Sequence, residues 1–191
     1  MRILLINVPH PAIGSRIPRE QLPPLGLLSI GGPLIDAGYD VALIDGEFGP
    51  MKYEAIVEQA LAYAPDAVLF GHTGSTSGHP TVMQVSRMIR ALMPRVPIVY
   101  GGVHPTYFWR DILSAEPQID IIVRGEGEET AVKLFEALRR QQSYFDIPGL
   151  AFRVDGEAHA TPYARTTLRP ARTPSPRQRY PHSASARTRR R

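Results

Sequence analysis

The chain has 191 residues, 43% of them hydrophobic, and it contains no cysteine. That length is enough for one domain with a buried core, and the missing cysteines exclude disulfides, thiolate nucleophiles and cysteine-ligated zinc or iron–sulfur sites in this sequence. The net charge of +4 is unevenly distributed, because residues 164–191 hold nine arginines and no acid, whereas residues 1–163 hold 13 basic and 18 acidic residues, a net of −5. The basic character therefore belongs to the tail.

The predicted elements begin with an apolar run over residues 2–8, which is typical of a buried parallel strand and is stopped by Pro9. A proline-rich loop follows, and a helix is predicted from Pro24 to Gly38. No region contains the ~20 uncharged apolar residues that a membrane span needs, and the first apolar run is too short for a signal peptide. We expect a cytoplasmic protein without membrane contact.

Two further strand–helix units follow. Residues 40–45 predict the second strand and residues 66–70 the third, with a helix between them that ends before Pro65. A polar loop rich in glycine and hydroxyl side chains covers residues 71–79, and the third helix is predicted to begin near Pro80. The backbone amides and hydroxyls of this loop suit a phosphate or an amide-bearing ligand.

The fourth strand ends at the tandem glycines Gly101 and Gly102, which leave bare backbone where the strand stops. We expect residues 101–106 to form a loop that admits a large ligand. Residues 119–123 predict the fifth strand. The glycine- and glutamate-rich segment 124–130 leads into the next helix, whose positive end favours the glutamates.

A change of composition marks the end of the predicted domain. Residues 149–161 predict a β-hairpin with an Asp155-Gly156 turn, and the arginine- and proline-rich composition from residue 164 onward predicts disorder. The expected organisation is a main domain over residues 1–146, a hairpin or start of an inter-domain link over 147–163, and a disordered tail over 164–191.

The alternation of five strands with helices predicts an α/β fold with a flavodoxin-like (Rossmann-like), doubly wound parallel sheet in the order 2-1-3-4-5. In such a sheet the loops at the carboxyl ends of the strands share one edge, where ligands bind. Every unusual loop of the sequence follows a strand, whereas the opposite loops are short and plain. The sequence therefore predicts a binding site at the carboxyl edge.

The spacing of the loop residues excludes several common sites. The loop after the third strand matches neither a Walker loop nor a Gly-x-Gly-x-x-Gly dinucleotide fingerprint. Four histidines fall in loops of the predicted edge, but none lies near an acid at ligand spacing, so polar lining is favoured over metal ligation. These histidines are His10, His72, His79 and His104.

Three segments together carry a family resemblance. Pro-Pro-Leu-Gly-Leu-Leu at 23–28, Gly-Gly-Val-His-Pro-Thr at 101–106 and Arg-Gly-Glu-Gly-Glu-Glu-Thr at 124–130 resemble the N-terminal cobalamin-binding domain of cobalamin-dependent radical S-adenosylmethionine enzymes. The resemblance covers about residues 1–161. Within the family, residues 7–18 and 71–80 are most similar to the anaerobic magnesium-protoporphyrin monomethyl ester oxidative cyclases of bacteriochlorophyll synthesis.

The resemblance implies a cobalamin lying across the strand ends. The resemblance would place the corrin or its nucleotide tail against the glycines after the fourth strand. It would place the nucleotide tail against the hydroxyl-rich loop of residues 71–79. The loop after the second strand lacks the Asp-x-His-x-x-Gly motif that supplies a cobalt ligand in many cobalamin domains, so the axial ligand stays open. The residues with implied cofactor contacts are Pro9, His10, His72, Thr73, Gly74, Ser75, Thr76, Gly101, Gly102, His104, Pro105, Gly125, Glu126 and Gly127.

The resemblance also implies a second domain with a Cys-x-x-x-Cys-x-x-Cys motif, whose cluster this sequence has no cysteine to hold. We therefore expect no catalysis by this chain alone. The parent reaction would be the anaerobic, ring-forming oxidation of a magnesium-porphyrin ester. The tail has the composition of an out-of-frame reading of a GC-rich gene, and we expect it to be a truncation scar, which the nucleotide sequence can test.

Two alternatives remain open. The first is a metal-dependent α/β enzyme that uses the loop histidines. The second is a polyanion binder that uses the nine tail arginines, which is disfavoured because the tail has no helical pattern and no interleaved aromatic residue beyond Tyr180. Nucleic acid is therefore not an expected partner.

Overall fold

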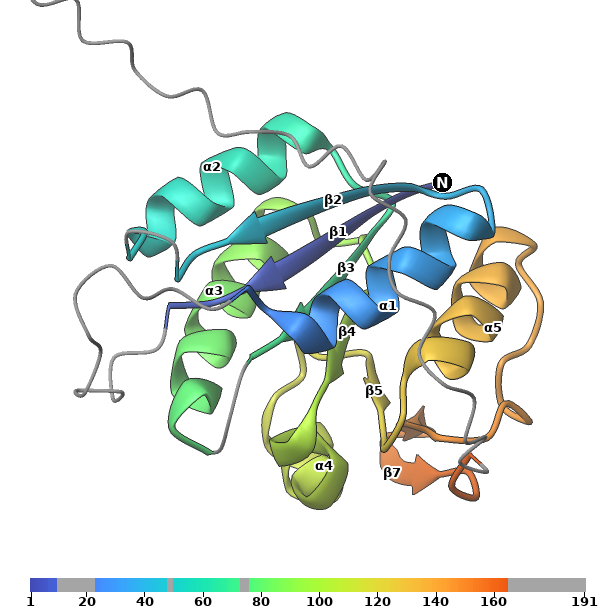
Figure 1. The fold of residues 1–191 in the computed structure, drawn as a ribbon. Helices are drawn as coiled ribbons and strands as arrows, with labels where there is room; N and C mark the ends of the chain where they lie inside the picture. Colours follow the sequence, from blue (N-terminus) through green and yellow to red (C-terminus); the bar gives the residue numbers. More distant parts are fainter. Residues whose placement is uncertain (10–22, 48–49, 73–75, 165–191) are drawn as a thin grey trace, which may run out of the picture.

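Seven strands form one sheet in the computed structural model, which describes residues 1–9, 23–47, 50–72 and 76–164. The strand order is β2-β1-β3-β4-β5-β6-β7, with β1 to β5 parallel and β6 and β7 antiparallel (Figure 1). The predicted order is confirmed, and the predicted hairpin extends the sheet beyond β5. The strands are β1 (Arg2–Asn7), β2 (Asp40–Asp45), β3 (Ala67–Gly71), β4 (Ile98–Gly101), β5 (Ile121–Val123), β6 (Leu150–Val154) and β7 (Glu157–Ala160).

Helices cover both faces of the sheet. The helices α1 and α5 pack side by side on one face (Figure 1), and α2, α3 and α4 cover the other. Among the helices of the described residues, none combines the length and the apolar character of a membrane span. The helices are α1 (Leu25–Asp36), α2 (Tyr53–Tyr63), α3 (His79–Leu92), α4 (Val103–Ala115) and α5 (Glu128–Arg139), and a short 3-10 helix covers Thr76–Gly78.

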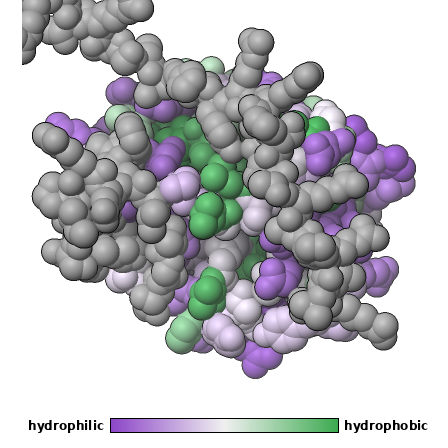
Figure 2. Space-filling model, viewed as in Figure 1, coloured by the Kyte–Doolittle hydropathy of each residue, from purple (hydrophilic) through white to green (hydrophobic). Residues whose placement is uncertain are grey.

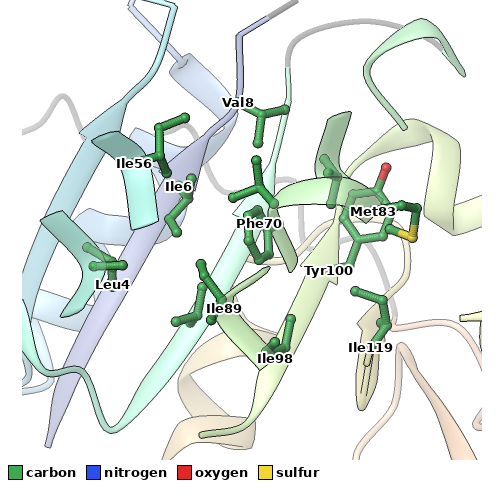
Figure 3. Packing of buried hydrophobic residues seen from close by; sticks show 14 of the residues in the cluster. Leu4, Ile6, Val8, Ile56, Phe70, Met83, Ile89, Ile98, Tyr100 and Ile119 are labelled. Atoms are coloured by element: carbon green, nitrogen blue, oxygen red, sulfur yellow. The ribbon is translucent and has the colours of Figure 1, made fainter. Parts of the chain in front are cut away.

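Alternating side chains of the strands divide the core in two. In β3, Val68 and Phe70 face α2 and α3, whereas Leu69 faces α1 and α5. All three are buried, which is why the strands read as continuous apolar runs. Figure 3 shows Phe70 and Tyr100 within the first of these two cores.

The sequence prediction missed α4. Residues 101–106 were expected to be a loop, but α4 begins at Val103, and His104, Pro105 and Thr106 are buried in its first turn. The first N–H groups of a helix have no intrahelical acceptor, so Pro105 can be accommodated there. The glycine–glycine turn therefore leads directly into a helix.

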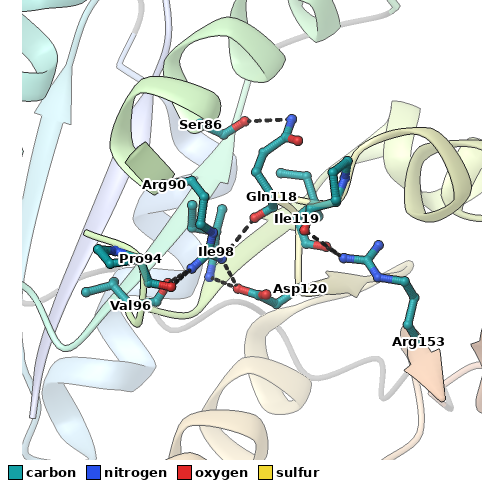
Figure 4. A network of polar contacts seen from close by, with 10 residues as sticks. Ser86, Arg90, Pro94, Val96, Ile98, Gln118, Ile119, Asp120 and Arg153 are labelled. Atoms are coloured by element: carbon teal, nitrogen blue, oxygen red, sulfur yellow. Dashed lines mark hydrogen bonds and ion pairs between the residues drawn. The ribbon is translucent and has the colours of Figure 1, made fainter. Parts of the chain in front are cut away.

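A network of hydrogen bonds around an arginine joins the loops at the amino ends of β4 and β5 (Figure 4). The guanidinium of Arg90 donates to the carbonyl oxygens of Val96 and Gln118, both at 3.0 Å, and pairs with the carboxylate of Asp120. That carboxylate also accepts the backbone N–H of Ile98 at 2.7 Å. The plain loops before β4 and β5 are thus held together by side-chain hydrogen bonds.

Replacing Arg90 with methionine is expected to lower the free energy of unfolding by about 1–3 kcal/mol, because several part-buried acceptors lose their donor. Urea denaturation of both proteins measures the difference. Arg87→Met is the matched control: Arg87 is exposed where it pairs with Glu116, and its loss should cost about 0–1 kcal/mol. Equal effects of the two substitutions would contradict the structural role of the Arg90 network.

Candidate functional site

The carboxyl ends of the parallel strands lie side by side at one edge of the sheet. The register pairs Asn7 of β1 with Asp45 on one side and Gly71 on the other, and it pairs Gly101 of β4 with Val123 of β5. The loops predicted to form the site therefore leave the sheet from neighbouring positions, as expected from the doubly wound topology.

The turn after β4 exposes bare backbone. Gly102 has a φ of 114° and a ψ of −173°, a conformation that side-chain-bearing residues rarely adopt. Among the described residues, a Cβ added there would have only the carbonyl oxygen of His72 within 4 Å, at 3.9 Å. The space beside Gly102 is thus open enough for a ligand to approach the main chain.

One hydroxyl joins the loops after β4 and β5. The Thr106 O–H donates to the carbonyl oxygen of Gly102 at 2.7 Å, and the backbone N–H of Gly125 donates to the same hydroxyl oxygen at 2.9 Å. The two segments that carry the strongest motif are therefore hydrogen-bonded to each other through Thr106.

Aromatic rings line the edge between α3 and α4. His72 shares a 2.8 Å hydrogen bond with the Tyr100 hydroxyl, and the His79 ring stacks on Tyr100 with centroids 6.0 Å apart. The His79 and His104 rings are 4.5 Å apart, and His104 stacks on Phe108 at 4.7 Å. The loop after β3, the strand β4 and the helices α3 and α4 thus contribute to one continuous row of rings.

Burial lowers the pKa of two of these histidines, which favours their neutral form. It lowers the pKa of His79 below its usual 6.5, the nearby His104 and Arg87 lower it further, and only the carboxylate of Glu116 opposes them. Burial also lowers the pKa of His104. Neutral rings can stack and can donate or accept hydrogen bonds at neutral pH.

Stability should fall as the pH falls from 7.5 to 5.5. In the unfolded chain His79 and His104 take up protons near pH 6.5, whereas the folded protein holds them neutral to a lower pH, so the unfolded state binds more protons. Urea midpoints across this range measure the effect. His79→Asn combined with His104→Asn should flatten the slope, and an unchanged slope would contradict the neutral state of the pair.

The glycines after β5 have packing roles. Gly125 has a φ of 75°, and a Cβ on Gly127 would lie 2.6 Å from Cδ1 of Ile30 in α1. Gly127 caps the start of α5, whose first turn carries Glu128 as predicted. Of the three candidate residues here, only Gly125 and Glu126 are exposed.

The loop after β2 forms a polar corner. The Asn7 side-chain amide donates to the Asp45 carboxylate at 2.8 Å, and that carboxylate also accepts the backbone N–H of Glu47 at 3.2 Å. Pro9 is buried beside Gly46, where an added Cβ would be 3.0 Å from the proline ring. Pro9, a candidate contact residue, is thus part of the wall of this corner.

Hydrophobic side chains reach the surface beside this edge. Val103, at the start of α4, is 64% exposed, and Phe108, at the end of the row of rings, is 46% exposed. Figure 2 shows hydrophobic side chains at the surface over α1 and over the start of α4. The edge therefore offers an apolar platform beside the bare backbone of Gly102.

The structure brings most candidate residues to this edge, though not all can be placed. His10, Thr73, Gly74 and Ser75 lie outside the described residues, and only the backbone of Thr76 is described, within the short 3-10 helix. Within the described ranges no three His, Asp or Glu side chains converge as a metal site would require. The metal hypothesis therefore has two adjacent histidines, His79 and His104, but no third described ligand.

Sequence reasoning missed Tyr100 and Phe108. Tyr100 reads as an ordinary residue of a buried strand, and its hydrogen bond to His72 depends on tertiary packing. Phe108 lies in the unpredicted helix. A helical reading of residues 103–115 would have placed it one turn after His104.

Comparison with known families identifies the fold. Residues 18–135 match the model of the B12 binding domain. The chain belongs to the B12-binding domain family. The segment of this B12-binding domain that matches the family model includes β2 to β5 and the loops at their carboxyl ends.

Curated relatives match this chain over part of their own length. The chain is 59% identical over 155 residues to the anaerobic magnesium-protoporphyrin IX monomethyl ester cyclase of Synechocystis, and 32% identical over 176 residues to that of Cereibacter sphaeroides. These matches cover 81% and 88% of this chain but only 31% and 28% of the relatives. The chain therefore spans about a third of their length.

Solved structures confirm the architecture of the B12-binding domain. The radical S-adenosylmethionine methyltransferase TsrM of Kitasatospora setae, with cobalamin and a [4Fe-4S] cluster bound, matches with a TM-score of 0.70 and 22% identity over 90% of this chain and 30% of its own. The cobalamin-dependent radical enzyme OxsB, with aqua-cobalamin and S-adenosylmethionine bound, matches with a TM-score of 0.73 and 18% identity over 86% of this chain and 22% of its own. At these identities the likeness concerns the fold.

Proposed function

We propose that this chain binds cobalamin across the carboxyl edge of its sheet. The observation that carries the proposal is the open, side-chain-free turn at Gly102, set beside exposed apolar residues within the matched B12-binding segment. A corrin is a large, flat and mostly apolar ring with amide arms. The platform at Val103 and Phe108 suits the ring, and exposed main-chain groups suit the arms.

The remaining candidate residues have different roles in this proposal. His104 and Pro105 fix the start of α4 beneath the ligand, and Gly125 and Glu126 line the neighbouring loop. For His10, Thr73, Gly74 and Ser75, which lie outside the described residues, a cofactor contact is what the family resemblance implies. Cobalamin would supply the organometallic chemistry, while this domain supplies binding and orientation.

The binding test uses the purified chain and hydroxocobalamin. We expect a corrin absorbance that stays with the protein through gel filtration, at about one corrin per chain. Corrin that elutes entirely as free ligand would contradict the proposal. Stoichiometric zinc or iron in the purified protein, together with that result, would favour the metal-dependent alternative.

We further propose that the domain serves the cyclisation of a magnesium-porphyrin ester in bacteriochlorophyll synthesis. The identity of 59% to the Synechocystis cyclase supports this assignment. Catalysis requires further protein, because this sequence has no cysteine to hold an iron–sulfur cluster. Replacing the matching segment of that cyclase with residues 1–161 should preserve ring closure, and loss of activity in a chimera that still binds cobalamin would argue against the assignment.

A further inference from the structure

The Nε atom of Arg124 is buried without a hydrogen-bond acceptor. Arg124 directly follows β5 and is 5% exposed, and its Nε is fully enclosed with no partner. Of the 18 acidic residues in the sequence, only Glu20 falls outside the described part of the chain. None of the carboxylates within that part pairs with Arg124.

Two aromatic rings hold the guanidinium in place. Its central carbon lies 4.1 Å from the Tyr163 ring centroid and 5.4 Å from that of Trp109 in α4. Ring faces attract the cation, but they do not accept hydrogen bonds from the N–H groups at its rim. Burial of a charge costs free energy unless the charge is paired or hydrogen-bonded, so an oxyanion that accepted a hydrogen bond from Nε would stabilise this arrangement.

The backbone of Arg124 lies at the proposed ligand edge, directly after β5. Arg124 precedes Gly125, whose N–H is tied through the Thr106 hydroxyl to the Gly102 turn. Trp109 follows Thr106 by three residues in α4, just after the kink at Phe108. An anion that reaches Arg124 would thus contact the same corner as a ligand on Gly102.

We propose that Arg124 is the oxyanion-binding residue of this edge. A guanidinium presents a planar fork of N–H donors that matches phosphate and carboxylate oxygens. The oxyanion could come from the phosphodiester of a corrinoid nucleotide tail, which rests on the proposed function, or from a free phosphate, which does not.

The experiment compares the wild-type chain with Arg124→Met and Arg124→Lys. Thermal unfolding is followed with and without inorganic phosphate, and affinities are measured for cobalamin and for cobinamide, which lacks the nucleotide and its phosphate. Arg110→Met is the matched control, since Arg110 also stacks on Trp109, at 5.0 Å, but is exposed. Arg124→Lys retains a cation if Arg124→Met fails to fold.

Either of two results supports the proposal. Arg124→Met weakens cobalamin about tenfold and leaves cobinamide unchanged, or phosphate raises the unfolding temperature of the wild type and of Arg110→Met but not of Arg124→Met. The proposal is overturned if phosphate acts equally on all variants and both corrinoids lose the same affinity. If the wild type binds neither corrinoid, the proposed function fails and the phosphate measurement alone decides.

Discussion

Replacing Gly102 with alanine is expected to abolish corrin retention and to destabilise the fold by about 1–3 kcal/mol, the usual cost of a side chain in this backbone region. The residue has a φ of 114°, and its missing side chain leaves the open space beside the main chain. A methyl group there strains the turn and occupies the space that the ligand needs. Gel filtration with hydroxocobalamin and urea denaturation measure the two effects.

Gly156→Ala separates strain from ligand contact. Gly156 has a φ of 86° in the turn between β6 and β7, and no atom of the described part of the chain lies within 4 Å of a Cβ placed there. It should show a similar loss of stability with full corrin retention. If Gly102→Ala also retains the corrin, the turn after β4 is not part of the ligand site.

Replacing Phe70 with alanine is expected to lower the free energy of unfolding by about 3–5 kcal/mol. Phe70 is 0% exposed in β3, the middle one of the five parallel strands, and Figure 3 shows it between Val8 and Ile89 of the same core. Close-packed neighbours on a sheet cannot collapse into the space that the ring leaves, so the cost includes a cavity. Urea denaturation monitored by circular dichroism measures the loss.

Leu92→Ala serves as the control for this core substitution. Leu92 ends α3 and is 57% exposed, so its truncation should change stability by less than about 0.5 kcal/mol. Comparable losses for the two variants would mean that β3 does not carry the tight core described above.

The parallel sheet could be predicted because its strands are buried on both faces. Each strand therefore reads as an unbroken apolar run, and the alternation with helices limits the order of the strands to very few choices. The hairpin could be predicted from its Asp155-Gly156 turn, a dipeptide that favours the tight turn between two antiparallel strands. That the hairpin pairs with β5 could not be predicted, since both an edge position and an inter-domain link satisfy the same local pattern.

The candidate site was predictable as a location more than as a set of contacts. The glycines at 101–102 and the loops around them indicated the carboxyl edge. The helix α4 was not predicted, because a proline such as Pro105 is common both in the first turn of a helix and in a loop. Gly127 was predicted to contact the cofactor, which stays a prediction, and its close approach to Ile30 adds a packing requirement between α5 and α1 that the sequence did not indicate. Such distinctions depend on neighbours that are distant in the sequence.

The hydroxyl of Thr106 has a consequence for binding thermodynamics. The hydroxyl donates a hydrogen bond to the turn at Gly102 and accepts one from the loop at Gly125. These two hydrogen bonds hold both loops in place before any ligand binds. The conformational entropy of this side of the site is therefore lost during folding and not during binding, which is the meaning of preorganisation. A ligand that spans both loops consequently meets one rigid surface instead of two independent ones.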